Sequence, residues 1–149
     1  MSGAELTVLL AEDDDGHATL IQRHLVRAGL TARFLRARDG REALALFGQR
    51  DRDRRGRFVV LLDIRMPRLD GIEVLRILKS EQGTCAIPIY MLTTTDDPRD
   101  IERCFELGCN AYLTKPTVPD QLVETIRRLA SFLQVGALPE VPLLAATNP

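Results

Sequence analysis

The sequence has almost no net charge. Among its 149 residues, 20 are basic and 21 are acidic, which leaves a net charge of −1. Such a protein has no overall electric field that would draw it to nucleic acid or to an anionic membrane surface. We therefore expect no nucleic-acid partner and no membrane partner, and we expect local surface features to select its partners.

Long apolar runs and paired cysteines are also missing. No stretch approaches the ~18 apolar residues of a membrane-spanning helix, and no basic N-terminal region leads into an apolar segment of signal-peptide length. The three cysteines, Cys85, Cys104 and Cys109, are odd in number and form no CxxC pair, which favours a reducing compartment over a disulfide framework. These features predict a cytoplasmic protein with structural thiols.

Apolar runs of strand length alternate with one-sided apolar patterns of helical period. Hydrophobic residues make up 45% of the chain, which suffices for one core. Right-handed crossovers then predict an α/β fold with a doubly wound, five-stranded parallel sheet and helices on both faces. The expected strands are 6–11, 31–36, 58–63, 87–92 and 110–114, and the last helix is expected at about 120–133.

Two segments carry charges that mark them as peripheral. Arginines inside 31–36 indicate an edge strand. Residues 50–57 interleave arginine and aspartate without aromatic residues, which favours a solvated loop over a nucleic-acid patch.

Polar side chains stand where four of the apolar runs end. The central run, 58–62, is apolar throughout and stops at a carboxylate, as expected for a strand buried on both faces. Because the carboxyl ends of parallel strands meet at one edge of the sheet, we expect these polar side chains to converge in a ligand-binding crevice. They are Glu12, Asp13, Asp63, Thr93 and Lys115.

This set of side chains requires both a cation and an anion. Clustered carboxylates repel one another, and Mg²⁺, a hard cation that prefers oxygen ligands, relieves that repulsion. A phosphoryl group on Asp63 would give its oxygens to the metal, to the Lys115 ammonium and to the Thr93 hydroxyl. The sequence therefore predicts Asp63 as a carboxylate nucleophile in a Mg²⁺-dependent phosphoryl transfer.

The strand-end residues and the short motifs behind them resemble the receiver domain of bacterial two-component response regulators, the CheY-like family. The resemblance covers about residues 6 to 134 and implies a flavodoxin-like (βα)5 fold with strand order 2-1-3-4-5. It rests on Glu12-Asp13, Asp63, Met66-Pro67, Asp70-Gly71, Leu92-Thr93 and Tyr112-Leu113-Thr114-Lys115-Pro116.

The resemblance implies a role for each acidic position. Asp63 matches the phosphoacceptor, Asp13 a direct Mg²⁺ ligand, and Glu12 a neighbour that acts on the metal through water. The backbone carbonyl of Arg65 matches a third protein ligand. The domain would be a phosphoacceptor rather than an enzyme with a separate substrate, although it catalyses its own phosphorylation and dephosphorylation.

The resemblance also implies a switch. Thr93 and Lys115 match the hydroxyl and the lysine that hold the phosphoryl oxygens. Tyr112 matches the aromatic residue that such domains turn inward when the threonine moves toward the phosphoryl group. The change is a shift between two conformations, driven by local contacts.

A narrower resemblance concerns 119–124, the residues after Leu133 and the loop at 50–57. These are similar to the single-domain regulators that pair with phytochrome histidine kinases. This resemblance implies a phosphohistidine on a light-sensing kinase as the phosphoryl donor, and no output domain.

Other functions use some of the same residue types. A haloacid-dehalogenase phosphatase needs a second aspartate two residues after the nucleophile, where this chain has Arg65. A nucleotide-binding module needs a glycine-rich phosphate loop after the first strand, where this chain has the acids 12–15. A degenerate receiver that serves only as a protein-binding scaffold stays open.

The C-terminal part has more apolar residues than its helix needs. We assign 1–134 to the receiver domain and 135–149 to a C-terminal tail. Val123 and Phe132 are expected beside the buried stripe of the last helix, about 80 to 100° away from it at helical period. We therefore expect a homodimer through the helix that starts at Asp97, the strand 111–114, and the last helix with its tail.

Overall fold

The computed structural model describes residues 6–49 and 57–134, and five strands alternate with five helices in these ranges. All strand pairs are parallel, in the order β2-β1-β3-β4-β5, so the predicted fold class and strand order are confirmed. The strands are β1 (Leu6–Ala11), β2 (Arg33–Ala37), β3 (Arg57–Leu62), β4 (Ile89–Thr93) and β5 (Ala111–Thr114). The helices are α1 (Asp15–Arg27), α2 (Gly40–Gln49), α3 (Gly71–Ser80), α4 (Pro98–Leu107) and α5 (Pro119–Gln134).

The register of the sheet brings the strand ends to one level. Ala11 pairs with Ala37 on one side and with Leu62 on the other, so the residues that follow these positions leave adjacent strands together. Thr93 pairs with Thr114 in the same way. β2 lies at the edge of the sheet, as its charged residues predict.

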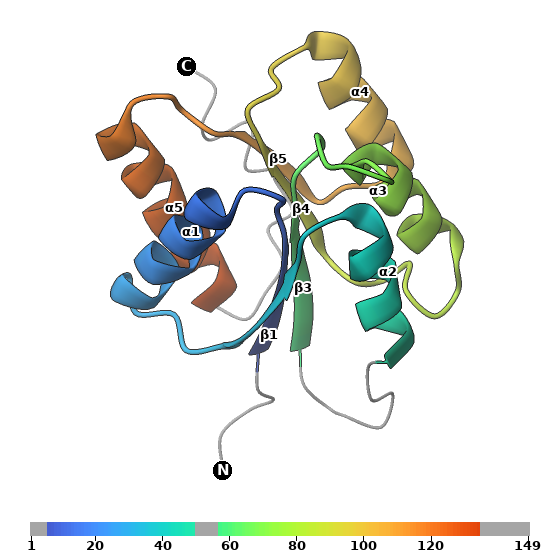
Figure 1. The fold of residues 1–149 in the computed structure, drawn as a ribbon, viewed down its shortest axis with the longest axis horizontal. Coiled ribbons are helices and arrows are strands. Elements are labelled where there is room, and N and C mark those ends of the chain that lie inside the picture. The colour runs from blue at the N-terminus through green and yellow to red at the C-terminus, as the bar shows by residue number, and fades with distance from the viewer. Residues whose placement is uncertain (1–5, 50–56, 135–149) are drawn as a thin grey trace.

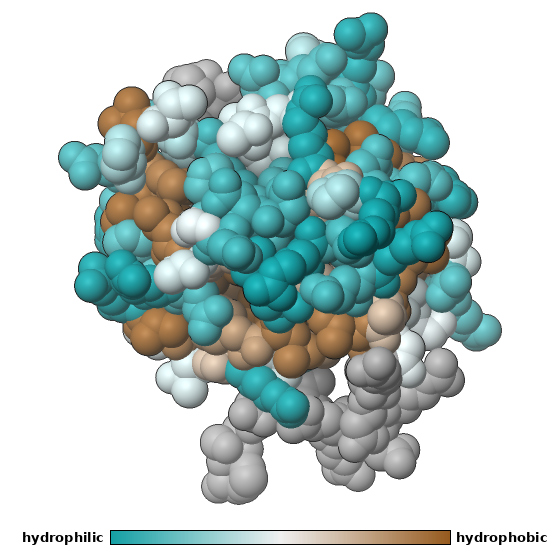
Figure 2. Space-filling model, viewed as in Figure 1, coloured by the Kyte–Doolittle hydropathy of each residue, from teal (hydrophilic) through white to brown (hydrophobic). Residues whose placement is uncertain are grey.

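Helices cover both faces of the sheet, as Figure 1 shows. On one face α1 and α5 pack beside each other over a core cluster that includes Ile21 and Ile126. On the other face α2, α3 and α4 enclose a second cluster that includes Leu75 and Cys104. Figure 2 shows hydrophilic side chains over the middle of the face that it presents, with a band of hydrophobic residues below them.

Aspartates precede four of the helices. The side chains of Asp14, Asp39, Asp70 and Asp97 accept backbone N–H groups at the starts of α1, α2, α3 and α4. Each cap satisfies a donor that has no partner inside its helix, and a carboxylate there also interacts favourably with the helix dipole. Proline follows Asp97 at the first helical position, so the predicted start of α4 is confirmed.

The turn after α4 explains the burial of two cysteines. Gly108 ends the helix in the left-handed conformation, with φ of 105°, and the Cys109 N–H donates to the Cys104 carbonyl at 3.0 Å. This pairing brings the flanking side chains together in the core. Both thiols are buried, and burial raises the pKa of each to about 12. Cys85 is exposed, so it is not the structural thiol that we expected.

Some sequence predictions fall on other parts of the chain. The loop 50–56 and the tail 135–149 lie outside the described residues, so their predicted roles stay predictions. In the described ranges, no helix combines the length and the apolar character that crossing a membrane requires.

The loop that follows β3 passes close to glycine backbones. A Cβ on Gly71 would lie 2.0 Å from the Asp63 carbonyl oxygen, and one on Gly40 would lie 2.1 Å from the Leu69 carbonyl oxygen. The Gly71 N–H donates to the Ile64 carbonyl at 2.8 Å, which closes the loop on itself. Both positions need glycine because the backbone of the loop occupies the space of a side chain.

Replacing Gly71 by alanine should therefore cost stability. We expect Gly71→Ala to lower the free energy of unfolding by about 1–3 kcal/mol, as overpacking does. Gly48, in α2, is the control, because a Cβ there would meet nothing within 4 Å. Gly48→Ala should raise stability by roughly 0.5–1 kcal/mol through helix propensity. Urea unfolding of both variants measures the difference, and equal effects would contradict this account of the loop.

Candidate functional site

Lys115 gathers the acidic side chains at the carboxyl edge of the sheet. Its ammonium hydrogen-bonds the Glu12 carboxylate and lies 3.3 Å from Asp63 Oδ2. The backbone N–H of Lys115 donates to the Thr93 carbonyl at 2.7 Å, which anchors the lysine beside β4. The structure thus places the residues predicted from the strand ends at one edge of the sheet.

The interior of this site is shielded from water. Glu12 is 2% exposed and Asp63 8%, and Lys115 and Thr93 are buried as well. Burial raises the pKa of the Glu12 carboxyl, and the hydrogen bond and positive charge of Lys115 partly oppose that rise. Glu12 Oε2 also accepts the Asp14 N–H at 3.2 Å, so both carboxylate oxygens of Glu12 are held.

Three carboxylates come close enough to share one metal ion. Glu12, Asp13 and Asp63 each offer an oxygen, and these oxygens lie within 4.8 Å of one another. The single Lys115 ammonium leaves part of their negative charge unbalanced. The Asp13 side chain is exposed and makes no hydrogen bond or ion pair within the described ranges. A hard divalent cation fits this set of oxygen donors.

Thr95 links three residues around Asp63. Its amide nitrogen lies 3.4 Å from Thr93 Oγ1, and its carbonyl accepts the Tyr112 hydroxyl at 2.6 Å. Its own hydroxyl lies 3.4 Å from Arg65 Nε. The Tyr112 ring is buried, so it has the inward position that the resemblance implies for one of two states.

Two sequence predictions about side chains have different outcomes. The Arg65 side chain is exposed and turns toward Thr95, while the role of its carbonyl as a metal ligand stays a prediction. Phe132 is half-buried and packs against the core cluster between α1 and α5, so it is not the surplus apolar surface that we expected. The helical angle alone could not show this, because a large ring beside the buried stripe still reaches the core.

Two arginines near the site received no role from the sequence. Arg36, in β2, donates to the Glu12 carbonyl from Nε at 2.9 Å and from Nη2 at 2.7 Å. Arg68 follows β3 with a left-handed φ of 70°, and its guanidinium pairs with Asp39 at 2.6 Å. One sequence feature could have pointed to Arg36: it stands next to the end of the edge strand, which pairs with β1.

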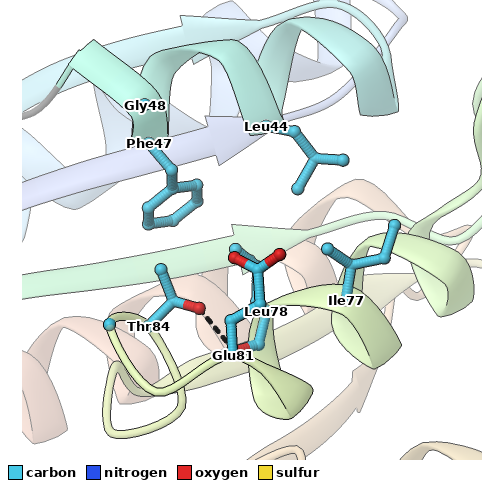
Figure 3. Close-up of a pocket in the computed structure, with 8 residues that line it drawn as sticks. Leu44, Phe47, Gly48, Ile77, Leu78, Glu81 and Thr84 are labelled. Carbon is cyan, nitrogen blue, oxygen red and sulfur yellow. Dashed lines mark hydrogen bonds between the residues drawn. The ribbon is translucent and has the colours of Figure 1, made fainter.

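A separate groove lies between the C-terminal parts of α2 and α3 and has a volume of about 270 Å³. Leu44 and Phe47 from α2 face Ile77 and Leu78 from α3, as Figure 3 shows, and Glu81 stands beside them. None of the acidic-site residues lines this groove, so it does not belong to the site around Asp63.

Comparison with known proteins identifies a family for most of the chain. The response regulator receiver domain family matches residues 8–127. The probable methanogenesis regulatory protein FilR2 of Methanothrix harundinacea (strain 6Ac) is 38% identical over 130 residues, which cover 84% of this chain and 81% of that protein. Response regulator Rcp1 of Synechocystis sp. (strain ATCC 27184 / PCC 6803 / Kazusa) is 32% identical over 136 residues, which cover 89% of this chain and 92% of Rcp1.

Solved structures give the same result. A response regulator receiver domain from Rhodospirillum rubrum superposes with a TM-score of 0.80 at 39% identity, over 91% of this chain and 99% of that one. The phosphorylated cyanobacterial phytochrome response regulator RcpA superposes with a TM-score of 0.81 at 31% identity, over the same shares. The Mn²⁺-bound form of Rcp1 has a TM-score of 0.79 at 31% identity, over 89% of this chain and 98% of Rcp1.

The two tyrosines of the chain allow a direct test of the inward position of Tyr112. Burial raises the pKa of Tyr90 to about 12 and raises the pKa of Tyr112 above its ordinary value of 10.0. We expect the phenolate absorbance of the folded protein to stay flat while the pH passes 10.0. Because the unfolded chain ionises first, stability should fall as the pH rises above that value.

The variant Tyr90→Phe isolates Tyr112 in this titration. A phenolate signal at the pH of a free tyrosine, from a protein that is still folded, would place Tyr112 outside the core. Circular dichroism on the same samples distinguishes that result from unfolding.

Proposed function

Because this chain belongs to the response regulator receiver domain family, we propose that it accepts a phosphoryl group from a histidine kinase on Asp63. The observation that supports this most is the contact of the Asp63 carboxylate with Lys115, in a nearly buried site that Glu12 shares. Lys115 partly neutralises the resting carboxylates and stays in place to bind the oxygens of an incoming phosphoryl group.

A divalent cation, Mg²⁺, completes the site in this proposal. Asp13 and Asp63 would bind it directly, Glu12 would act through water, and the Arg65 carbonyl would supply a further oxygen. The proximity of the three carboxylate oxygens and their unbalanced negative charge support this ligand set. The ion supplies positive charge that offsets the negative charge on the transferred group. Rcp1, which is similar to this chain, has been solved with Mn²⁺ bound.

The chain itself carries out the transfer. An Asp63 oxygen attacks the phosphorus of the phosphohistidine, an O–P bond forms, and the N–P bond to the imidazole breaks. The released imidazole nitrogen takes its proton from solvent. In autodephosphorylation, water attacks the same phosphorus, inorganic phosphate leaves, and the Asp63 carboxylate is restored.

The switch follows from the position of Thr93. Its hydroxyl can donate toward a phosphoryl oxygen, because its contact with the Thr95 N–H uses it as an acceptor. Thr95 also holds the Tyr112 hydroxyl, so a movement of 93–95 would carry the ring with it. The inward and outward positions of Tyr112 are the two states whose populations phosphorylation shifts.

The kinase partner in this proposal is a phytochrome. RcpA, which is similar to 91% of this chain, is a phytochrome response regulator. Residues 119–124, at the start of α5, share the narrower resemblance to that type of regulator.

A homodimer through α4, β5 and α5 is also part of the proposal. Val123 on α5 is half-buried, and Val118, just before α5, is 48% exposed. Phe132 contributes less than the sequence suggested, since it packs on the core. An isologous contact here would lie beside Tyr112, so phosphorylation and association would be coupled.

Substitution of Asp63 tests the function directly. We expect wild-type protein, incubated with a small acyl phosphate and Mg²⁺, to gain one phosphoryl group by intact mass, and Asp63→Asn to gain none. Asp70→Asn is the matched control, because asparagine retains the helix cap at the start of α3. A wild-type protein that stays unlabelled would favour the scaffold function instead.

Sedimentation velocity tests the dimer. The full chain should sediment as a dimer at tens of micromolar, more so with the phosphodonor present. Val123→Arg should abolish that association, whereas Val26→Arg, at an equally apolar and 53% exposed site on α1, should not. A wild-type monomer under both conditions would exclude the proposed interface.

A further inference from the structure

Arg36 lies against the acidic cluster and has no part in the function proposed above. Its side chain is 24% exposed. The guanidinium donates to the Glu12 carbonyl from Nε at 2.9 Å and from Nη2 at 2.7 Å. Nη2 also donates to Asp15 Oδ1 at 2.9 Å. Because the guanidinium is planar and rigid, binding both acceptors fixes the Glu12 carbonyl and the Asp15 carboxylate relative to each other.

The carbonyl that Arg36 binds belongs to the peptide between Glu12 and Asp13. The amide side of Glu12 is also held, because its N–H donates to the Ala37 carbonyl at 3.0 Å. The Glu12 side chain is held by Lys115 and by the Asp14 N–H. Arg36 thus restrains the remaining polar group of Glu12 and the backbone from which the Asp13 side chain leaves.

We propose that Arg36 is a positioning residue for the divalent cation site. It orients the Glu12–Asp13 peptide so that the Asp13 carboxylate, which has no other restraint in the described ranges, is presented to the metal. The inference rests on the metal site in the proposed function. Residues that orient metal ligands in this way commonly change metal affinity when they are removed.

The charge of Arg36 and its hydrogen bonds have opposite effects on the affinity for the metal. A cationic side chain near a metal site repels the metal, so removal of the charge alone should tighten binding slightly. The ion pair with Asp15 offsets much of that repulsion. Loss of affinity on removing Arg36 would therefore report the carbonyl contact rather than the charge.

Arg38 provides a matched control. Its Nε lies 3.5 Å from the same Asp15 Oδ1, its side chain is 63% exposed, and it does not touch the Glu12 carbonyl. Arg38→Gln thus removes the same charge beside the same carboxylate. Only Arg36→Gln also removes the paired contact with the backbone.

The experiment is a calorimetric titration of the full-length protein with Mn²⁺ and, separately, with Mg²⁺. Arg36→Gln should raise the dissociation constant on the order of tenfold, whereas Arg38→Gln should leave it unchanged or slightly lower, as expected for an exposed and screened charge. Arg36→Lys keeps the charge without the paired N–H groups, so it should also bind the metal more weakly than wild type. Circular dichroism of each variant without metal shows that the titrated protein is folded.

The outcomes separate the two proposals. Wild-type protein that binds neither ion would overturn the metal site and the role of Arg36 together. Binding by wild type with equal constants for Arg36→Gln and Arg38→Gln would overturn the role of Arg36 alone. Wild-type affinity in Arg36→Lys would show that the paired N–H contact with the Glu12 carbonyl is not needed for metal binding, and it would overturn the positioning role even if Arg36→Gln did not fold.

Discussion

One buried ammonium group holds the carboxyl edge of the sheet together. Lys115 follows β5, yet its side chain reaches the carboxylates that follow β1 and β3, so it crosses the end of β4. Removing the Lys115 ammonium would leave two buried carboxylates without their shared cation, at a cost of roughly 3–5 kcal/mol. The site therefore depends on a contact that also fixes how the strand ends sit relative to one another. The contact of Lys115 with Glu12 and Asp63 thus belongs both to the site and to the packing of the strand ends.

Backbone groups do much of the positioning around this contact. The Asp63 carbonyl leaves no space for a side chain at Gly71, and the Thr95 peptide contacts Thr93 on one side and Tyr112 on the other. The peptide unit is planar, so the N–H of Thr95 and the preceding carbonyl keep a fixed relative orientation. Under the proposed switch, a movement at Thr93 would act on the Tyr112 ring through the backbone of this one residue.

Much of this arrangement could be predicted from the sequence because strand ends in a parallel sheet share one edge. The central apolar run and its terminal Asp63 indicated where the site would lie, and Gly108 and Asp97-Pro98 marked the bounds of α4. The contact of Arg36 with a carbonyl was not predictable, because it depends on the register between neighbouring strands. The left-handed backbone of Arg68 and the inward packing of Phe132 likewise depend on tertiary contacts that no local pattern encodes.

The uneven burial of the cysteines has a practical consequence. Cys104 and Cys109 are buried and their thiols resist ionisation, whereas Cys85 is exposed in the segment between α3 and β4. Alkylating reagents attack the thiolate, so they discriminate strongly among these positions. Cys85 precedes β4 at the amino edge of the sheet, away from Asp63, so the native chain carries a selective attachment point for a fluorophore or spin label. A probe there would report on the protein without altering any residue of the site around Asp63.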